Sequence, residues 1–136
     1  MEERPKVGVG VLIKKDDKIL FLQRKNAHGE GSWCPPGGHL EFNEEFEECA
    51  KREVLEETGI KIKNIKIAGL TNDIFKEEGK HYITIHMLAE YDSGEATIKE
   101  PEKSTEIGWF AWTNLPGPLF TPTQNLKKSG FNPLNF

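Results

Sequence analysis

Short apolar runs and alternating apolar and polar positions recur along this chain, and each of them predicts a β-strand. The run from Val7 to Ile13 predicts a buried strand, and Ile19 to Gln23 predicts a second strand that forms a hairpin with the first. Further strands are predicted over Ile67–Phe75, His81–Tyr91, Glu95–Lys99 and Glu106–Trp112. The alternation in the run that begins at His81 places Tyr82 and Thr84 on the same face of its strand.

Two segments instead have the end signals of helices. The first lies between Asn43, a residue suited to an N-cap, and Gly59, which suits the left-handed position after a helix. The second is predicted over Thr121–Ser129, with Thr121 as the N-cap and Pro122 in the first turn. Strands interleaved with helices predict an α/β protein in one domain over residues 1–136.

The first helix carries acidic side chains on the side that should face the core. At about 100° per residue, Phe46, Ala50 and Val54 fall on one side of the helix. Three carboxylates continue this apolar stripe at its C-terminal end, namely Glu53, Glu56 and Glu57. Unpaired carboxylates on an inward face would cost several kcal/mol or would be protonated.

Two interpretations of these charges stand side by side. A solvated, Glu-rich helix accounts for the outward charges but poorly for Glu53, Glu56 and Glu57. A hard divalent cation accounts for all three, because Mg²⁺ binds a few carboxylates together with water and substrate phosphates. Arg52 either orients one of these carboxylates or forms a plain surface ion pair.

The spacing around this helix matches a known motif. Gly38 is followed after five residues by Glu44, and after seven more by the run Arg52-Glu-Val-Leu-Glu-Glu-Thr-Gly-Ile. Every fixed position of the Nudix box is filled, and the chain resembles a Nudix hydrolase over nearly its whole length. This resemblance implies a Nudix fold, in which a mixed β-sheet is sandwiched between helices (α/β/α).

The resemblance also implies a metal-dependent hydrolysis of a nucleoside diphosphate linked to another group. Mg²⁺ is the expected ion, with Mn²⁺ as an alternative. The implied catalytic residues are Arg52, Glu53, Glu56 and Glu57. The implied metal ligands are the same three carboxylates, a backbone carbonyl of Gly37 or Gly38, and one further Glu from a late loop. Glu102 is the candidate for that last ligand, with Glu100 and Glu106 as rivals.

Residues outside the box resemble the MutT-like nucleoside-triphosphate diphosphatases. The resembling segments include Val7-Gly-Val-Gly and His81-Tyr-Ile-Thr-Ile, and the Leu119-Phe120 pair before the last helix. In that group, late aromatic residues help to form a purine pocket, the enzymes are homodimers, and some accept oxidised guanine nucleotides. The resemblance therefore implies hydrolysis of a triphosphate to a monophosphate and pyrophosphate, a homodimer, and a role in nucleotide-pool sanitation.

Four residues are candidates for substrate binding, each with a plainer alternative. Arg24 either grips a phosphate through its planar guanidinium or is a solvated loop charge. Trp33 either stacks on the base or belongs to the core. Thr84 lies on a strand that is expected to line the nucleoside pocket, and Phe120 is the late aromatic residue implied by the resemblance.

Three other functions remain open from the sequence. One is hydrolysis of ADP-ribose or a nucleotide sugar, and another is a Nudix domain that binds a ligand without catalysis, although its Arg-Glu-x-x-Glu-Glu run is intact. The third, RNA decapping, would favour a basic track, whereas the net charge is −4. We accordingly expect no nucleic-acid polymer as a partner.

Composition adds expectations about cysteines and location. The two cysteines, Cys34 and Cys49, have no zinc-type spacing and are expected to be reduced thiols. No segment approaches 18 apolar residues, and the start of the chain lacks a signal-peptide pattern. We therefore expect a cytoplasmic protein that does not enter a membrane.

Overall fold

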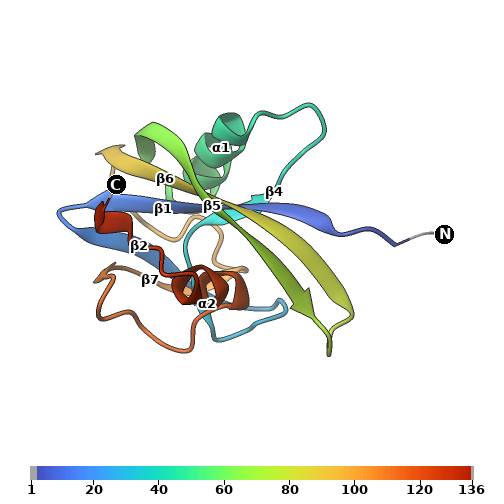
Figure 1. Ribbon diagram of the computed structural model, residues 1–136. Coiled ribbons are helices and arrows are strands. Elements are labelled where there is room, and N and C mark those ends of the chain that lie inside the picture. The colour runs from blue at the N-terminus through green and yellow to red at the C-terminus, as the bar shows by residue number, and fades with distance from the viewer. Residues whose placement is uncertain (1–2, 136) are drawn as a thin grey trace.

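The computed structural model describes residues 3–135, and residues 1, 2 and 136 of the predicted domain lie outside the described part. Seven strands form one mixed sheet, with helix α1 on one face and helix α2 on the other (Figure 1). The elements are, in chain order, β1 (Lys6–Lys15), β2 (Lys18–Arg24), β3 (Trp33–Cys34), β4 (Gly37–His39), α1 (Phe46–Thr58), β5 (Lys61–Phe75), β6 (Lys80–Ser93), β7 (Ser104–Ala111), α2 (Thr121–Lys128) and a short 3-10 helix (Pro133–Asn135). The predicted α/β architecture is confirmed.

Strand β1 is the centre of the sheet, whose order is β3-β2-β1-β6-β5. It pairs in parallel with β6 and antiparallel with β2 and β4, while β7 pairs with β2. The predicted hairpin of β1 and β2 is paired only next to its turn, where Lys14 lies opposite Ile19 and Lys15 opposite Lys18. Beyond that point the two strands separate, and β4 pairs with the first half of β1 through Gly8–Gly10.

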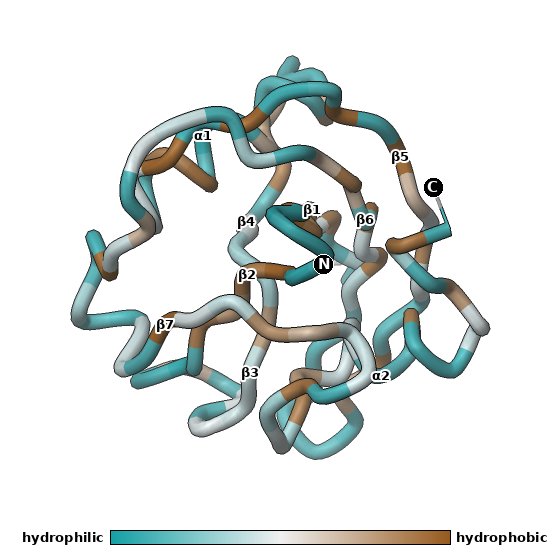
Figure 2. The backbone as a smooth tube through the Cα atoms, turned by 90° about the vertical axis from the view of Figure 1, so that its left-hand side faces the viewer, coloured by the Kyte–Doolittle hydropathy of each residue, from teal (hydrophilic) through white to brown (hydrophobic). Residues whose placement is uncertain are grey.

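Alternation along the central strands divides the hydrophobic residues between the two faces of the sheet. Val9 and Val11 of β1 face α1 and pack with its buried Ala50 and Val54. The opposite face carries a second cluster that includes Leu126 of α2. In Figure 2 the two helices accordingly lie on opposite sides of β1 and β6. Both faces of the sheet are covered, which is the layered arrangement implied by the resemblance.

The helix ends differ slightly from those predicted. Helix α1 begins at Phe46 with Glu45 as its N-cap, and the N–H of Glu45 donates to Glu48 Oε1 at 2.9 Å. Asn43 is not the cap, because it sits in the preceding turn with a φ of 65°. Helix α2 is capped by Phe120 rather than by Thr121, which forms its first turn. The predicted Gly59 end of α1 is confirmed, with a φ of 79° and an N–H bond to Leu55 O.

Two predicted strand boundaries in the second half of the chain are also corrected. Strand β5 runs without interruption from Lys61, because its first residues pair with the end of β6. Residues 95–99 do not form a strand, since their N–H groups bond to the end of α1 instead: Thr97 donates to Thr58 O and Lys99 to Glu57 O, both at 3.0 Å. This contact brings the following residue, Glu100, to the end of the helix that carries Glu57.

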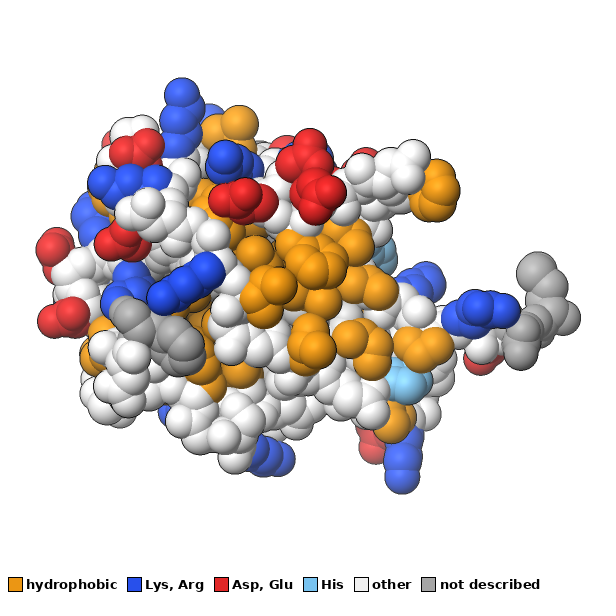
Figure 3. All heavy atoms as spheres, turned by 45° about the horizontal axis from the view of Figure 1, so that its top comes forward, with side chains coloured by type: hydrophobic (Ala, Val, Ile, Leu, Met, Phe, Trp, Pro, Cys, Tyr) orange, Lys and Arg blue, Asp and Glu red, His pale blue; other side chains and the backbone are white. Residues whose placement is uncertain are grey.

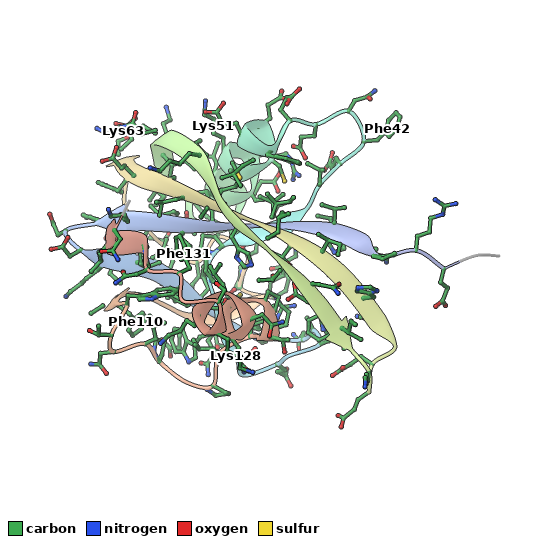
Figure 4. The ribbon with its side chains drawn as sticks, in the orientation of Figure 1. Phe42, Lys51, Lys63, Phe110, Lys128 and Phe131 are labelled. Carbon is green, nitrogen blue, oxygen red and sulfur yellow. The ribbon has the colours of Figure 1, made fainter. Side chains whose placement is uncertain are left out.

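Hydrophobic side chains also reach the surface on the side of the sheet that carries α1. Figure 3 shows them gathered beside acidic side chains, and the exposed hydrophobic residues include Ile67 and Leu70 of β5. Phe42, in the loop between β4 and α1, is 95% exposed and points away from the protein (Figure 4). None of these three residues lines the cleft described next.

Candidate active site

A cleft of about 720 Å³ is lined by residues from both helices and from all seven strands. Its floor crosses β1 at Gly8 and Gly10 and reaches β4 at Gly37 and Gly38. Carboxylates of α1 lie at one end, which we call the carboxylate end. Aromatic rings from the loop after β2, from β5, from β6 and from the start of α2 form what we call the aromatic wall, namely His28, Phe75, Tyr82 and Phe120.

The carboxylate end is built on one turn of α1. Glu53 and Glu57 are four residues apart, so their side chains lie on the same face of the helix and both line the cleft. The N–H of Gly37 donates to Glu57 Oε1 at 3.2 Å. A Cβ at position 38 would overlap the carboxylate of Glu53, so this carboxylate can approach the backbone only because residue 38 is glycine.

The two carboxylates are held together at an electrostatic cost. Burial raises the pKa of Glu57 to about 8, and the neighbouring negative charge of Glu53 adds to the shift. The charge of Glu100 acts in the same direction, while the N–H of Gly37 opposes it. A pair of carboxylates arranged in this way favours a bound cation, because a positive charge relieves both the burial and the repulsion.

Arg52 ties Glu53 to the start of the same helix. Its guanidinium contacts Glu53 Oε1 at 2.7 Å and both oxygens of Glu44 at 2.7 and 3.0 Å. The hydrogen bonds from Arg52 lower the pKa of Glu44 to about 2. Of the two interpretations of Arg52, the structure favours the one in which it orients a carboxylate, because the side chain of Glu53 is only 13% exposed.

The remaining predicted ligands are not gathered at this end. Glu56 has a side chain that is 51% exposed and meets Arg52 at 3.4 Å, so the expectation of an inward Glu56 is not met. Glu102 is exposed and lies outside the cleft lining, whereas its rival Glu100 acts electrostatically on Glu57. Within residues 3–135, no group of three or more His, Cys, Asp or Glu side chains is arranged to hold a metal ion. The structure thus brings together two of the three carboxylates of the box.

Three of the four predicted substrate-binding residues line the cleft: Arg24, Thr84 and Phe120. The guanidinium carbon of Arg24 lies 4.0 Å from the ring centroid of Phe120, and its Nε donates to His28 O at 3.0 Å. The fourth, Trp33, packs in the core beside Phe110 with ring centroids 5.3 Å apart, outside the cleft lining.

The sequence interpretation missed two groups of cleft residues. The aromatic wall contains His28, whose ring lies 4.7 Å from Phe75 and 5.3 Å from Phe120. A buried polar cluster beneath the cleft contains Asp73 and His86, both at most 3% exposed. The alternation that correctly placed Tyr82 and Thr84 on one face of β6 also places His86 there, whereas the register of β5 against β6 that brings Asp73 into this cluster was not predicted.

Both cysteines are free thiols, as expected, and Cys49 is buried in the core. Among the described residues there is no helix with both the length and the apolar character needed to cross a membrane.

Comparisons with known proteins agree with this fold and site. A family model described as NUDIX domain matches residues 4–129. The chain is 33% identical over 123 residues to the ADP-ribose pyrophosphatase of Methanocaldococcus jannaschii, an alignment that covers 90% of this chain and 72% of that protein. It is 35% identical over 106 residues to the NAD-capped RNA hydrolase NudC of Escherichia coli, but spans only 39% of that protein's length.

Solved structures of Nudix proteins are also similar to this fold. A MutT Nudix hydrolase from Burkholderia pseudomallei superposes with a TM-score of 0.86 at 35% identity, covering 92% of this chain and 98% of that one. A MutT protein from Methanosarcina mazei superposes with a TM-score of 0.78 at 25% identity, covering 95% of each chain. The chain belongs to the Nudix family. It is an enzyme of the Nudix hydrolase type, a class that acts on nucleotide substrates and generally uses divalent metal ions.

Proposed function

We propose that this enzyme hydrolyses a nucleoside triphosphate to the nucleoside monophosphate and pyrophosphate in a metal-dependent reaction. The observation that carries the proposal is the two-ended cleft, with Glu53 and Glu57 at one end and the aromatic wall at the other. A phosphate chain fits the carboxylate end when a cation is present, and a base fits among aromatic rings. The modest size of the cleft suits a single nucleotide.

Mg²⁺, with Mn²⁺ as an alternative, would be held by Glu53, Glu57 and a backbone carbonyl of Gly37 or Gly38. The donor set fits, because two carboxylates with room for phosphate oxygens and water are what Mg²⁺ prefers. Glu56 is the third ligand candidate of the box, and Glu100 replaces Glu102 as the candidate from the late loop because its charge acts on Glu57. When bound, a divalent ion neutralises phosphate charge and lowers the pKa of water.

The chain's own groups would position the substrate. Arg52 fixes the orientation of Glu53, and the N–H of Gly37 fixes Glu57. Arg24 lines the cleft with its guanidinium carbon 4.0 Å from the ring centroid of Phe120, and this guanidinium would bind a phosphate oxygen of the substrate.

A second candidate function is hydrolysis of ADP-ribose or a nucleotide sugar. The observation that favours it is the likeness to the archaeal ADP-ribose pyrophosphatase, 33% identical over 123 residues. The same carboxylate end would serve such a substrate. Only the products differ, because these substrates release two monophosphates and no pyrophosphate.

Product analysis with Mg²⁺ distinguishes the two functions. The panel is dGTP, 8-oxo-dGTP, dATP, CTP, dCTP, ADP-ribose, GDP-mannose and NAD-capped RNA. Monophosphate plus pyrophosphate from a triphosphate is the expected result. Cleavage confined to ADP-ribose or a nucleotide sugar would replace the first function by the second, and cleavage confined to the capped RNA would reject both.

Three expectations from the sequence analysis remain predictions. They are a homodimer, a cytoplasmic location and a role in nucleotide-pool sanitation. Sedimentation of the purified chain tests the first of them, with a mass of twice 15.4 kDa as the expected result.

A further inference from the structure

A buried polar cluster lies under the cleft, on the face of the sheet that carries α2. It consists of Thr71 and Asp73 of β5 and Thr84 and His86 of β6, and we call it the polar floor. All four residues are at most 9% exposed. Burying four polar side chains is unfavourable unless each of them is hydrogen-bonded, so the pattern of their bonds decides what they can offer to a ligand.

Asp73 accepts hydrogen bonds from the hydroxyl groups of both threonines. Its Oδ2 accepts from Thr84 Oγ1 at 2.6 Å and from Thr71 Oγ1 at 3.0 Å. Its Oδ1 accepts from Asn125 Nδ2 of α2 at 2.8 Å. A hydroxyl has only one proton to donate. Once Thr84 donates to Asp73, its oxygen can only accept a hydrogen bond from a ligand.

The same count of hydroxyl protons determines which ring nitrogen of His86 carries its proton. Its Nε2 lies 2.8 Å from Thr71 Oγ1, whose proton already points to Asp73. Nε2 must therefore carry the proton and donate to Thr71. Burial lowers the pKa of His86 to about 4 against the opposing charge of Asp73, so the ring is neutral and its Nδ1 carries a free lone pair.

These two acceptors lie next to open space in the cleft. Thr84 and His86 both line it, and their neighbours on β1 are Gly8 and Gly10. A Cβ at Gly8 would lie 3.9 Å from Thr84 Oγ1, and one at Gly10 would lie 3.9 Å from His86 Nδ1. Because both residues are glycine, the volume beside each acceptor is left for a ligand.

We propose that the polar floor reads the base of the substrate, with Thr84 Oγ1 and His86 Nδ1 accepting hydrogen bonds from N–H groups on the edge of the base. The ligand class is a nucleotide whose base presents more than one N–H donor on one edge. Guanine does so through its ring N–H and its exocyclic amine, whereas hypoxanthine lacks that amine. This proposal rests on the proposed function for the cleft, and Asp73 is its positioning residue.

The first test compares binding of GMP and IMP, which differ only in the exocyclic amine, by titration calorimetry. Wild type is expected to bind GMP at least about tenfold more tightly than IMP, because IMP leaves a buried acceptor unpaired. Gly10→Ala places a methyl group against His86 Nδ1 and is expected to reduce this ratio to within about threefold. Equal binding of GMP and IMP by wild type, or an unchanged ratio in Gly10→Ala, would overturn the proposal.

Gly69→Ala is the matched control. Gly69 and Gly10 both lie opposite His86, on β5 and on β1 respectively, but Gly69 is outside the cleft lining. The nearest atom to its added Cβ would be Leu126 Cδ1 at an ordinary 3.5 Å. This variant is expected to keep the wild-type ratio, and loss of the ratio in both variants would show a general disturbance of the sheet and count against the proposal.

A second measurement determines the tautomer and the charge of His86 in the absence of any ligand. Nitrogen-15 NMR of His86 is expected to show a neutral ring with its proton on Nε2. A proton on Nδ1 would make the floor a donor and would overturn the proposal.

Binding and hydrolysis can fail separately. Selective GMP binding that Gly10→Ala abolishes, without cleavage of any triphosphate, would support the floor and reject the proposed hydrolysis. Cleavage of triphosphates with no preference between dGTP and dITP would support the hydrolysis and reject the floor.

Discussion

Glu57 and Asp73 are two carboxylates buried near the same cleft, but their surroundings are opposite. Glu57 accepts one backbone N–H at 3.2 Å and faces the charge of Glu53, and its pKa is raised to about 8. Asp73 is fully buried and accepts hydrogen bonds from three side chains, Thr71, Thr84 and Asn125.

The difference separates a binding group from a positioning group. A buried carboxylate with too few donors has a strong affinity for a cation, because its charge is not compensated within the protein. A buried carboxylate with all of its partners present has nothing to offer a ligand, but it fixes the orientation of its neighbours. The carboxylate end and the polar floor therefore use the same chemical group in different roles.

The largest expected effect is on catalysis at the carboxylate end. Glu57→Gln should keep the fold and lower kcat/KM at least about a hundredfold, equivalent to about 2.7 kcal/mol of transition-state stabilisation, since it removes a metal ligand. The measurement is the rate of pyrophosphate release with Mg²⁺. Glu47→Gln, on the exposed first turn of the same helix, is the control and should be unaffected. Near-wild-type turnover in Glu57→Gln would show that Glu57 does not have this role.

The next effect is on stability at the polar floor. Asp73→Asn should lower the free energy of unfolding by about 2 kcal/mol, because the amide replaces a charged acceptor and sets an N–H₂ group against one of three donors. Urea unfolding without metal measures it. The same substitution at the exposed Asp92 should change stability by less than about 0.5 kcal/mol. An Asp73→Asn protein as stable as the Asp92→Asn protein would contradict the assigned role.

A smaller effect with the opposite sign is expected for Glu57 in the metal-free protein. Its folded pKa, about 8, lies above its ordinary value of 4.5, so the folded state holds a proton that the unfolded state has lost between these two values. Stability from this group is therefore lost as the pH rises from 4.5 to 8. Glu57→Gln should be more stable than wild type by about 1 kcal/mol or more at pH 8.5 and equal to it below pH 4.

Adding Mg²⁺ at pH 8.5 should reverse this order, because the ion stabilises wild type through Glu57 and gains less from glutamine. Thermal unfolding with and without Mg²⁺ provides both comparisons. A Glu57→Gln protein that is less stable than wild type without metal at pH 8.5 would show that Glu57 is already compensated.

The smallest effect concerns His86. Its folded pKa, lowered to about 4, leaves it neutral at pH 6, where most of the unfolded chain's His86, with an ordinary pKa of 6.5, is protonated. Its contribution therefore falls as the pH drops below 6.5, by about 0.8 kcal/mol between pH 8 and pH 6. His86→Gln should lack this loss, which urea unfolding at the two pH values measures. The same pH dependence in variant and wild type would exclude a buried neutral His86.

The carboxylate end was largely predictable because its parts are close in sequence. Glu53 and Glu57 are one helical turn apart, and Gly37 and Gly38 lie on the strand that precedes the helix. The exposed position of Glu56 was not predictable, since a helical wheel gives direction but not which neighbour, here Arg52, holds the side chain outside the cleft. The late-loop residue was not predictable either, because no local pattern shows where that loop meets α1. Hydrogen bonds from the 95–99 segment to α1 bring Glu100, rather than Glu102, to the carboxylate end.

The sequence by itself determined the fold class, the pair of helices and the inward carboxylates, because these follow from periodicity and spacing within single segments. Only the tertiary structure decided which side chains form the polar floor of the cleft. In the polar floor, Asp73 of β5 lies beside His86 of β6 and accepts a hydrogen bond from Asn125 of α2, which is 52 residues away in the chain. The register of β5 against β6, which is shifted by irregularities, and the packing of α2 bring these elements together, and no local pattern in the chain encodes that register or that packing.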